Sequence, residues 1–202
     1  MYELEVKVKQ LWVRRLLASY WKPDPEGQGC RGCPHYGNVW SCPPGLPATD
    51  EYLAPYSGCF LVGARVIYSP ETRARAVNQE EADRLREQGY EKVAKELLLT
   101  LLELEGQVPG GRCMGAGRCI LCRRCARLEG KPCRHPELCR YSITGFGFDF
   151  ARMVKEQLDF ELLWNPGGLP EYDVVVAALF YKQTSDADCA GSGPGAEVSR
   201  RE

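Results

Sequence analysis

The sequence predicts an α+β domain: a small, mostly antiparallel sheet with packed helices, and two cysteine-rich metal-binding loops grouped at one end. Two observations carry this prediction. Only three segments have the composition of strands, at 2–9, 59–68 and 172–181, and they stand far apart in the chain. The stretch between the second and third contains apolar residues at helical spacing. Strands so few and so separated do not suit a doubly wound parallel sheet, in which strands and helices alternate regularly.

The N-terminal segment reads as a strand followed by a helix. Apolar and charged residues alternate from Leu4 to Lys9, which is the pattern of a half-buried strand. Residues 11–21 are apolar enough to continue as a short helix that packs on the core. Proline and glycine then break regular structure between 23 and 29.

The middle of the chain predicts a buried strand and a long helical region. Residues 59–68 are rich in β-branched and aromatic side chains, and Cys59 within them is expected as a packed thiol. A serine–proline pair follows directly and offers an N-cap and a first helical residue. The helical region is expected to run to about Glu105 and to be weakened at Gly89.

The last part of the chain predicts a helix over 148–158, a short strand over 160–164 and the clearest strand of the sequence at its end. The composition of residues 183–202 is that of a disordered tail. We therefore expect residues 1–182 to form a single domain.

The second half of the chain carries cysteines at the spacing of metal ligands. Cys119, Cys122 and Cys125 are three residues apart, and Cys133 follows. Bacterial ferredoxins hold iron–sulfur clusters with such a C-x2-C-x2-C run and a remote fourth cysteine, whereas zinc sites more often pair two separated C-x2-C turns. The spacing predicts one [4Fe–4S] cluster on these four residues, with zinc as the alternative metal.

A second cysteine group stands nearer the N-terminus. Cys30, Cys33 and Cys42 lie in a stretch rich in proline and glycine, which predicts a stiff loop and a second metal site. The residues that could supply its fourth ligand are Cys59, Cys113, Cys133 and Cys139. Otherwise the fourth position stays open, and an open metal position is one at which a site can do chemistry.

Other side chains of the two loops admit two interpretations each. His35 and His135 follow a cysteine by two positions, so either could replace a thiolate and favour zinc, or simply bond a loop carbonyl. Trp40 and Tyr36 could shield a cluster from water or anchor the first loop.

Basic side chains crowd the second loop. Seven of them stand between residues 118 and 140, opposed by two glutamates. Guanidinium groups near an anionic cluster stabilise it, and an arginine-rich rim suits an acidic partner. The seven are Arg118, Arg123, Arg124, Arg127, Lys131, Arg134 and Arg140.

Composition restricts the function classes. The net charge of −1 over 202 residues gives no support for nucleic acid as a partner. No run of about 18 apolar residues exists, so no membrane span is expected, and the first residues lack the apolar core of a signal peptide. Eleven cysteines in short spacings fit metal ligation in a reducing cytoplasm better than a disulfide framework. Nucleotide-binding fingerprints are missing as well.

Two motifs together resemble one family. They are C-x2-C-P-x-Y-G-x2-W-x-C-P-P, from Cys30 to Pro44, and G-x-C-x-L-C-x2-C joined to P-C-R-H-P-E, from Gly117 to Glu137. Over about residues 25–180 the chain resembles the predicted metal-binding proteins of domain of unknown function 2284, found mostly in anaerobic bacteria and archaea.

The resemblance implies a cytosolic iron–sulfur or metal protein and no established reaction. The ligands it implies are Cys30, Cys33, Cys42, Cys119, Cys122, Cys125 and Cys133. The chain departs from the family pattern in two places: Thr144 stands where the family usually has a glutamate, and Cys139 is an additional thiol.

Three function classes follow from these observations. We expect an iron–sulfur protein that transfers electrons to or from a redox partner protein. The alternatives are an enzyme that uses an open iron site at the three-cysteine loop, and a zinc-stabilised interaction module. The oligomeric state is left open by the sequence.

Overall fold

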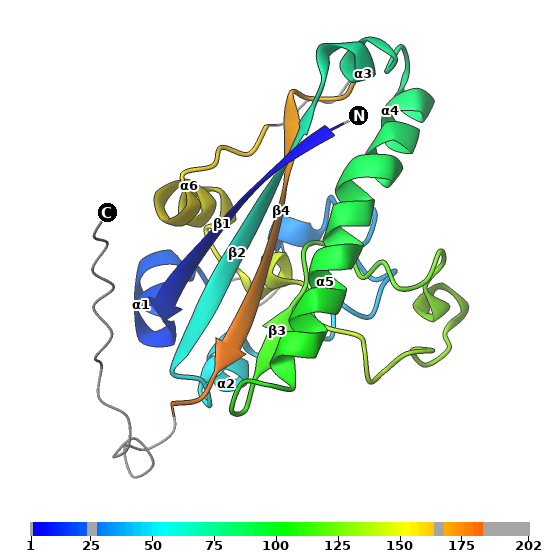
Figure 1. Cartoon of the computed structure of the whole chain (residues 1–202). Coiled ribbons are helices and arrows are strands. Elements are labelled where there is room, and N and C mark those ends of the chain that lie inside the picture. The colour runs from blue at the N-terminus through cyan, green and yellow to red at the C-terminus, as the bar shows by residue number, and fades with distance from the viewer. Residues whose placement is uncertain (1, 24–27, 164–167, 184–202) are drawn as a thin grey trace, which may run out of the picture.

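The computed structural model describes residues 2–23, 28–163 and 168–183. Its centre is a four-stranded antiparallel sheet with the strand order β1-β2-β4-β3 (Figure 1). The strands are β1 (Tyr2–Trp12), β2 (Gly58–Tyr68), β3 (Arg112–Met114) and β4 (Tyr172–Tyr181). The α+β class with a small antiparallel sheet is confirmed, and the three predicted strands are β1, β2 and β4.

Helices cover both faces of the sheet. On one face, α5 packs over β4 and β3, and α4, joined to α5 by a π-helical turn at Glu87–Glu91, packs Leu85 over β2 and β4. On the other face, α1 and α6 pack over β1 and β2 (Figure 1). The α-helices are α1 (Val13–Tyr20), α2 (Thr49–Leu53), α3 (Pro70–Ala74), α4 (Gln79–Arg86), α5 (Lys92–Glu105) and α6 (Phe150–Leu158). Three short 3-10 turns complete the elements, at Gln28–Cys30, Ala126–Glu129 and Ile143–Phe146.

The weak point expected at Gly89 is the π-helical turn. The ring of Tyr68 lies against this glycine, and a Cβ at position 89 would stand 2.8 Å from a ring carbon. The Tyr68 hydroxyl donates to Asp173 at 3.0 Å, which fixes the ring over the turn. The glycine is therefore required by close packing between the helix and the sheet.

Two elements differ from the expectation. The strand predicted over 160–164 is wrong for residues 160–163, and Trp164 lies outside the described residues. Phe160 is buried across the face of β2, where a Cβ on Gly63 would meet its ring at 3.2 Å, so this segment crosses the sheet and does not pair with it. The other difference is β3, which the glycine-rich sequence around it did not indicate.

The second cysteine loop is a closed excursion from the sheet. It leaves β3 at Gly115 and returns at Ser142, where these two residues form an isolated parallel bridge. The Gly115 N–H donates to the carbonyl of Tyr141 at 2.9 Å, and Ile143 N–H donates to the carbonyl of Gly115 at 3.2 Å. The loop projects beyond α5, on the side of the sheet away from β1 (Figure 1).

Two further expectations concern the ends and the environment of the chain. Apart from Gln183, the predicted tail over 183–202 lies outside the described residues. In the part of the chain that the structure describes, no helix combines the length and apolar character needed to cross a membrane.

Candidate metal centre

The cysteines of the second loop line one pocket. All four thiols that the sequence singled out there contribute to its wall, and the fifth cysteine of the loop joins them. These residues are Cys119, Cys122, Cys125, Cys133 and Cys139. Each is half-buried, so the pocket lies close to the surface. Trp40, Leu121 and Ala126 form its apolar walls.

Cys139 lies beside two other thiols of the pocket. Cys139 is hydrogen-bonded to both Cys119 and Cys133. The hydrogen bond from Cys139 lowers the pKa of Cys119, helped by the N–H of Leu121 and the charge of Arg118, and the same contact raises the pKa of Cys139. Cys119 is thus the thiol of this pair that gives up its proton first.

The thiols share a pocket without meeting at one point. Among the described residues, no group of three or more His, Cys, Asp or Glu side chains stands close enough together to hold a single metal ion. Around one zinc ion, with Zn–S bonds of about 2.3 Å, the sulfurs would need to approach one another to within about 4 Å. Around a cubane each thiolate binds a different iron, so the four sulfurs stand further apart.

A buried ion pair holds the end of the second loop. The guanidinium of Arg140 donates to Glu105 at the end of α5 with two bonds, of 2.9 and 2.7 Å. It also donates to the carbonyls of Glu137 at 2.7 Å and Cys139 at 3.1 Å. Burial alone would raise the pKa of Glu105, but the hydrogen bonds from Arg140 and from the Cys113 N–H, at 2.7 Å, lower it. Arg140 therefore positions Cys139.

Ser41 joins the two cysteine loops. It is fully buried, and its hydroxyl accepts a hydrogen bond from the backbone N–H of Cys119 at 2.8 Å. Its carbonyl accepts from the N–H of Ser142 at 2.9 Å, at the point where the second loop closes. One residue of the first loop thus fixes both the first thiol and the closing end of the second loop.

Arg127 clamps the first loop against the second. Its guanidinium donates to the carbonyls of Val39 at 2.8 Å, Cys42 at 3.0 Å and Pro44 at 2.6 Å. The same group lies over the ring of Trp40, 4.8 Å from its centroid. Both terminal nitrogens of this guanidinium are therefore engaged by the first loop.

Trp40 anchors the first loop, which is one of the two roles that the sequence left open. Its indole N–H donates to the carbonyl of Lys131 at 3.1 Å, which anchors the first loop to the second. Its ring also forms part of the pocket wall beside the thiols.

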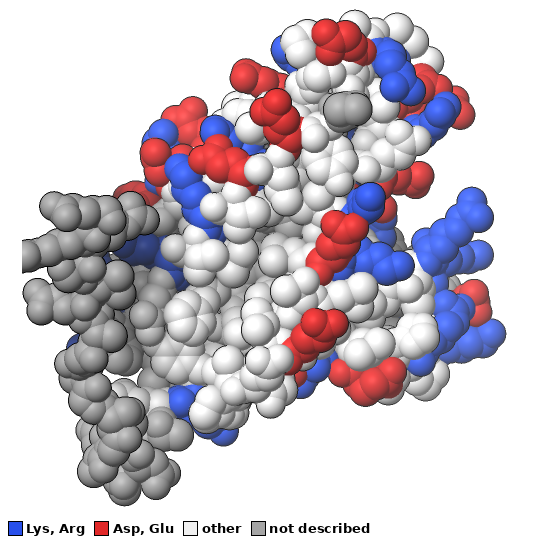
Figure 2. Space-filling model, in the orientation of Figure 1, with Lys and Arg blue, Asp and Glu red and all other residues white. Residues whose placement is uncertain are grey.

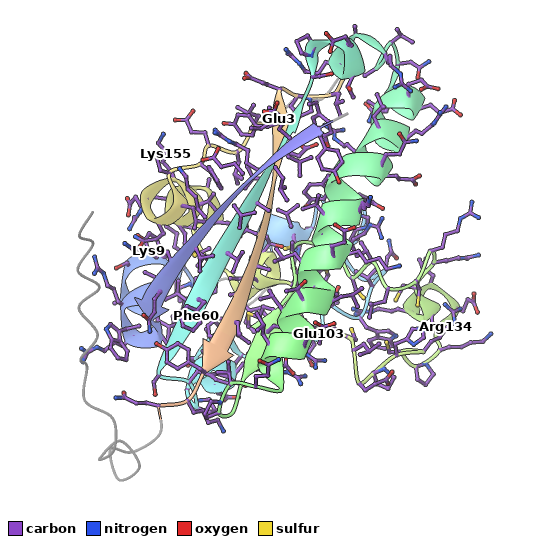
Figure 3. All side chains as sticks on the ribbon, in the orientation of Figure 1. Glu3, Lys9, Phe60, Glu103, Arg134 and Lys155 are labelled. Carbon is purple, nitrogen blue, oxygen red and sulfur yellow. The ribbon has the colours of Figure 1, made fainter. Side chains whose placement is uncertain are left out.

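The remaining basic side chains divide into two groups. Arg118 pairs with Glu91 on the π-helical turn, and it is therefore part of the scaffold. The others form an exposed group at the tip of the second loop, which we call the basic rim: Arg123, Arg124, Lys131 and Arg134. Figure 2 shows Lys and Arg side chains gathered at this end of the molecule, and Figure 3 places Arg134 on the projecting loop. Arg134 also lines the pocket.

The three thiols of the first loop lie near one another. Burial raises the pKa of Cys42, and the neighbouring thiols of Cys33, Cys30 and Cys119 raise it further, while a hydrogen bond with Ser41 opposes the rise. Cys33 is exposed. Cys119 is therefore the thiol of the second loop that raises the pKa of Cys42. The sequence had assigned Cys119 only to the metal site of the second loop.

The structure separates the four candidates for a fourth ligand of the first loop. Cys59 in β2 and Cys113 in β3 are fully buried, and burial raises the pKa of each to about 12. Both pack in the core of the sheet, and neither lines the pocket of the second loop. Cys133 and Cys139 belong to the pocket of the second loop.

The two histidines also differ. His135 lines the pocket of the second loop. His35 does not; burial lowers its pKa, and the charge of Arg118 lowers it further. Of the two, His135 is therefore the one that stands beside the thiols of the second loop.

Comparison with known proteins gives one match. A family model described as predicted metal-binding protein (DUF2284) matches residues 26–176, a range that includes both cysteine loops and most of the sheet. No curated protein and no solved structure matches the chain.

Proposed function

This chain belongs to the family of predicted metal-binding proteins (DUF2284), and on that premise we propose that its second loop holds a [4Fe–4S] cluster and exchanges electrons with a partner protein. When bound, such a cluster supplies a one-electron couple whose potential depends on hydrogen bonds, nearby charge and solvent exposure. The proposed setting is a reducing cytoplasm, where thiols stay available as ligands.

The observation that carries the proposal is the common pocket of the second-loop thiols. Soft thiolates select iron–sulfur clusters, zinc and copper(I) over hard cations. Cys119, Cys122 and Cys125 have the ferredoxin spacing, and either Cys133 or Cys139 completes a set of four. The donor set therefore fits the group.

The surroundings of the pocket suit electron transfer. Trp40, Leu121 and Ala126 exclude water from one side, while the half-buried thiols keep the site near the surface. The basic rim stands at the same end of a chain whose net charge is −1, so its field is local. An acidic redox partner would be steered to this end.

Zinc is the second candidate, and one observation favours it. Cys139 is hydrogen-bonded to Cys119 and to Cys133, which is closer than the separate corners of a cubane require, although a single ion would still need these sulfurs to move together. In that case the metal would stabilise the two loops, and the protein would be an interaction module.

An enzyme with an open iron site is the third candidate. The thiols of the first loop lie near one another, and Cys33 among them is exposed, so a metal held there would be accessible to a small molecule. This proposal needs a site at Cys30, Cys33 and Cys42 that is independent of the pocket of the second loop.

A redox titration followed by electron paramagnetic resonance separates the three. A carrier is expected to give a reversible signal that small molecules leave unchanged. A signal perturbed by a small molecule would favour the open-site enzyme. The absence of a signal, combined with unfolding by a chelator, would contradict electron transfer and favour the zinc module.

A further inference from the structure

Within residues 2–23, 28–163 and 168–183, no strand covers the outer edge of β1. Leu4, Val6 and Val8 are 51%, 52% and 59% exposed, which leaves more than half of each apolar side chain in water. They share the face of the sheet that α4 and α5 cover over the other strands, as their register with Val66, Ala64 and Val62 shows. The strand pairs with β2 along its whole length, and no residue that the structure describes is paired to its other side. Such an edge is a template for another strand.

Alternate residues of β1 direct their backbone groups to this open edge. The Val13 N–H donates to the carbonyl of Ser57 at 3.0 Å, and the hydrogen-bonded pairs between β1 and β2 continue from there in steps of two. The odd-numbered residues of β1 therefore bond to β2. The even-numbered ones, from Leu4 to Gln10, have N–H and C=O groups that point outward.

The charges along β1 are self-complementary. Two glutamates, Glu3 and Glu5, precede two lysines, Lys7 and Lys9, on the other face of the strand. Within one copy, Glu5 pairs with Arg65 and Lys7, and Lys7 also pairs with Asp159, so Glu3 and Lys9 carry most of the complementarity. In an antiparallel pair of β1 strands centred on Val6, Glu3 meets Lys9 of the second copy and Glu5 meets Lys7 of the second copy. Figure 3 shows Glu3 and Lys9 near opposite ends of the strand.

Other registers are worse. A shift that moves the centre to residue 5 sets Glu5 opposite Glu5, and one that moves it to residue 7 sets Lys7 opposite Lys7. Like charges directly opposite one another destabilise a strand pair. If the centre of the pair lay between two residues, even-numbered residues of one copy would stand opposite odd-numbered residues of the other. The backbone groups of the odd-numbered residues already bond to β2, so this register cannot form the inter-strand hydrogen bonds. Lysines on an edge strand ordinarily repel a second strand, but here the glutamates offset them.

We propose that the chain forms a two-fold symmetric dimer through antiparallel pairing of β1 with β1 of a second copy, centred on Val6. The contact is isologous, since each copy presents the same strand. Leu4 packs beside Val8 of the second copy, which removes the exposed apolar side chains from water. Since β3 and its cysteine loop lie at the opposite edge of the sheet, both basic rims stay free at the far ends of the dimer.

The test is the mass of the protein in solution, measured by light scattering and sedimentation. At a chain concentration of about 20 μM, a dimer with a micromolar dissociation constant is mostly assembled. The wild-type chain of 22.6 kDa is expected to sediment as a dimer. Val6→Pro removes an outward N–H without touching the bonds to β2, and it is expected to raise the dissociation constant at least tenfold. A monomeric wild-type protein would overturn the proposal.

Charge exchange tests the register. In the dimer, Glu3→Lys places a lysine at position 3 of each copy opposite Lys9 of the other copy. This variant is expected to weaken the dimer several-fold at low salt. Glu3→Lys combined with Lys9→Glu restores the opposite charges and is expected to restore the dimer. The matched control is Glu103→Lys, an exposed position on α5 that leaves the dimer unchanged (Figure 3). A dimer insensitive to Val6→Pro and to both charge variants would use another surface, which contradicts the proposal.

Discussion

The hydroxyl of Ser41 accepts a hydrogen bond from the backbone N–H of Cys119 at 2.8 Å, and this contact joins two loops that lie 78 residues apart in the chain. Cys119 stands at the start of the C-x2-C-x2-C run and also acts on the pKa of Cys42 in the first loop. The two cysteine groups are therefore parts of one structural unit, and a change in either is expected to affect the other.

Ser41→Ala tests this coupling. The substitution leaves the Cys119 N–H without its acceptor, and an unsatisfied buried donor costs about 1–3 kcal/mol. We expect that loss in the free energy of unfolding measured in urea, together with a lower metal content of the second loop. Ser19→Ala, at an exposed position of α1, is the control. Unchanged stability and metal content would contradict the coupling of the loops.

Arg127→Lys tests the clamp on the first loop. Lysine keeps the charge but cannot donate to three carbonyls or stack on Trp40 in the same way. We expect faster amide hydrogen exchange over residues 38–45, whereas Arg123→Lys in the basic rim leaves exchange there unchanged. If the amides of residues 38–45 exchange at the same rate in both variants, the guanidinium of Arg127 does not hold the first loop.

Glu105→Gln tests the ion pair that positions Cys139. Removing one partner of a buried pair is expected to cost about 3 kcal/mol at neutral pH. Because the pKa of Glu105 lies below its ordinary value of 4.5, its contribution is full above that value and is lost as the pH falls through the lower, folded-state pKa. The difference between variant and wild type, measured by urea unfolding, should therefore shrink below pH 4.5; a constant difference would contradict the assignment.

Single cysteine variants identify the ligands. Cys122→Ala is expected to remove one cluster's worth of iron, and Cys189→Ala, outside the described residues, to remove none. Comparing Cys133→Ala with Cys139→Ala decides which thiol completes the set, because only the ligand's loss lowers iron content. Full iron content in Cys122→Ala would contradict the proposed site.

Local patterns predicted what is local in this fold. The alternation in β1, the β-branched run of β2 and the spacing of the second-loop cysteines are each visible in a short window. β1, β2 and β4 were predicted, whereas the strand expected over 160–164 was wrong for residues 160–163 and β3 was missed. That the four second-loop thiols share a pocket agrees with their spacing, while their ligation stays a prediction.

The contacts that build the site are not local, and the sequence did not indicate them. Arg140 and Glu105 are 35 residues apart, so the sequence could not distinguish this arginine from those of the basic rim. In the sequence, Arg127 is one of seven basic residues that could balance the negative charge of a cluster. In the structure, its N–H groups donate to carbonyls that lie 83 to 88 residues earlier in the chain. The sequence offered Cys139 as a candidate fourth ligand of the first loop and as a thiol outside the family's usual set, whereas the structure places it in the pocket of the second loop.

The most direct test of the account is an iron, acid-labile sulfide and zinc analysis of protein purified without oxygen. The account predicts a brown protein with broad absorbance near ~400 nm, as expected for thiolate-bound iron–sulfur clusters, and about four irons and four sulfides for each occupied pocket. A colourless protein that carries stoichiometric zinc after anaerobic reconstitution would contradict it.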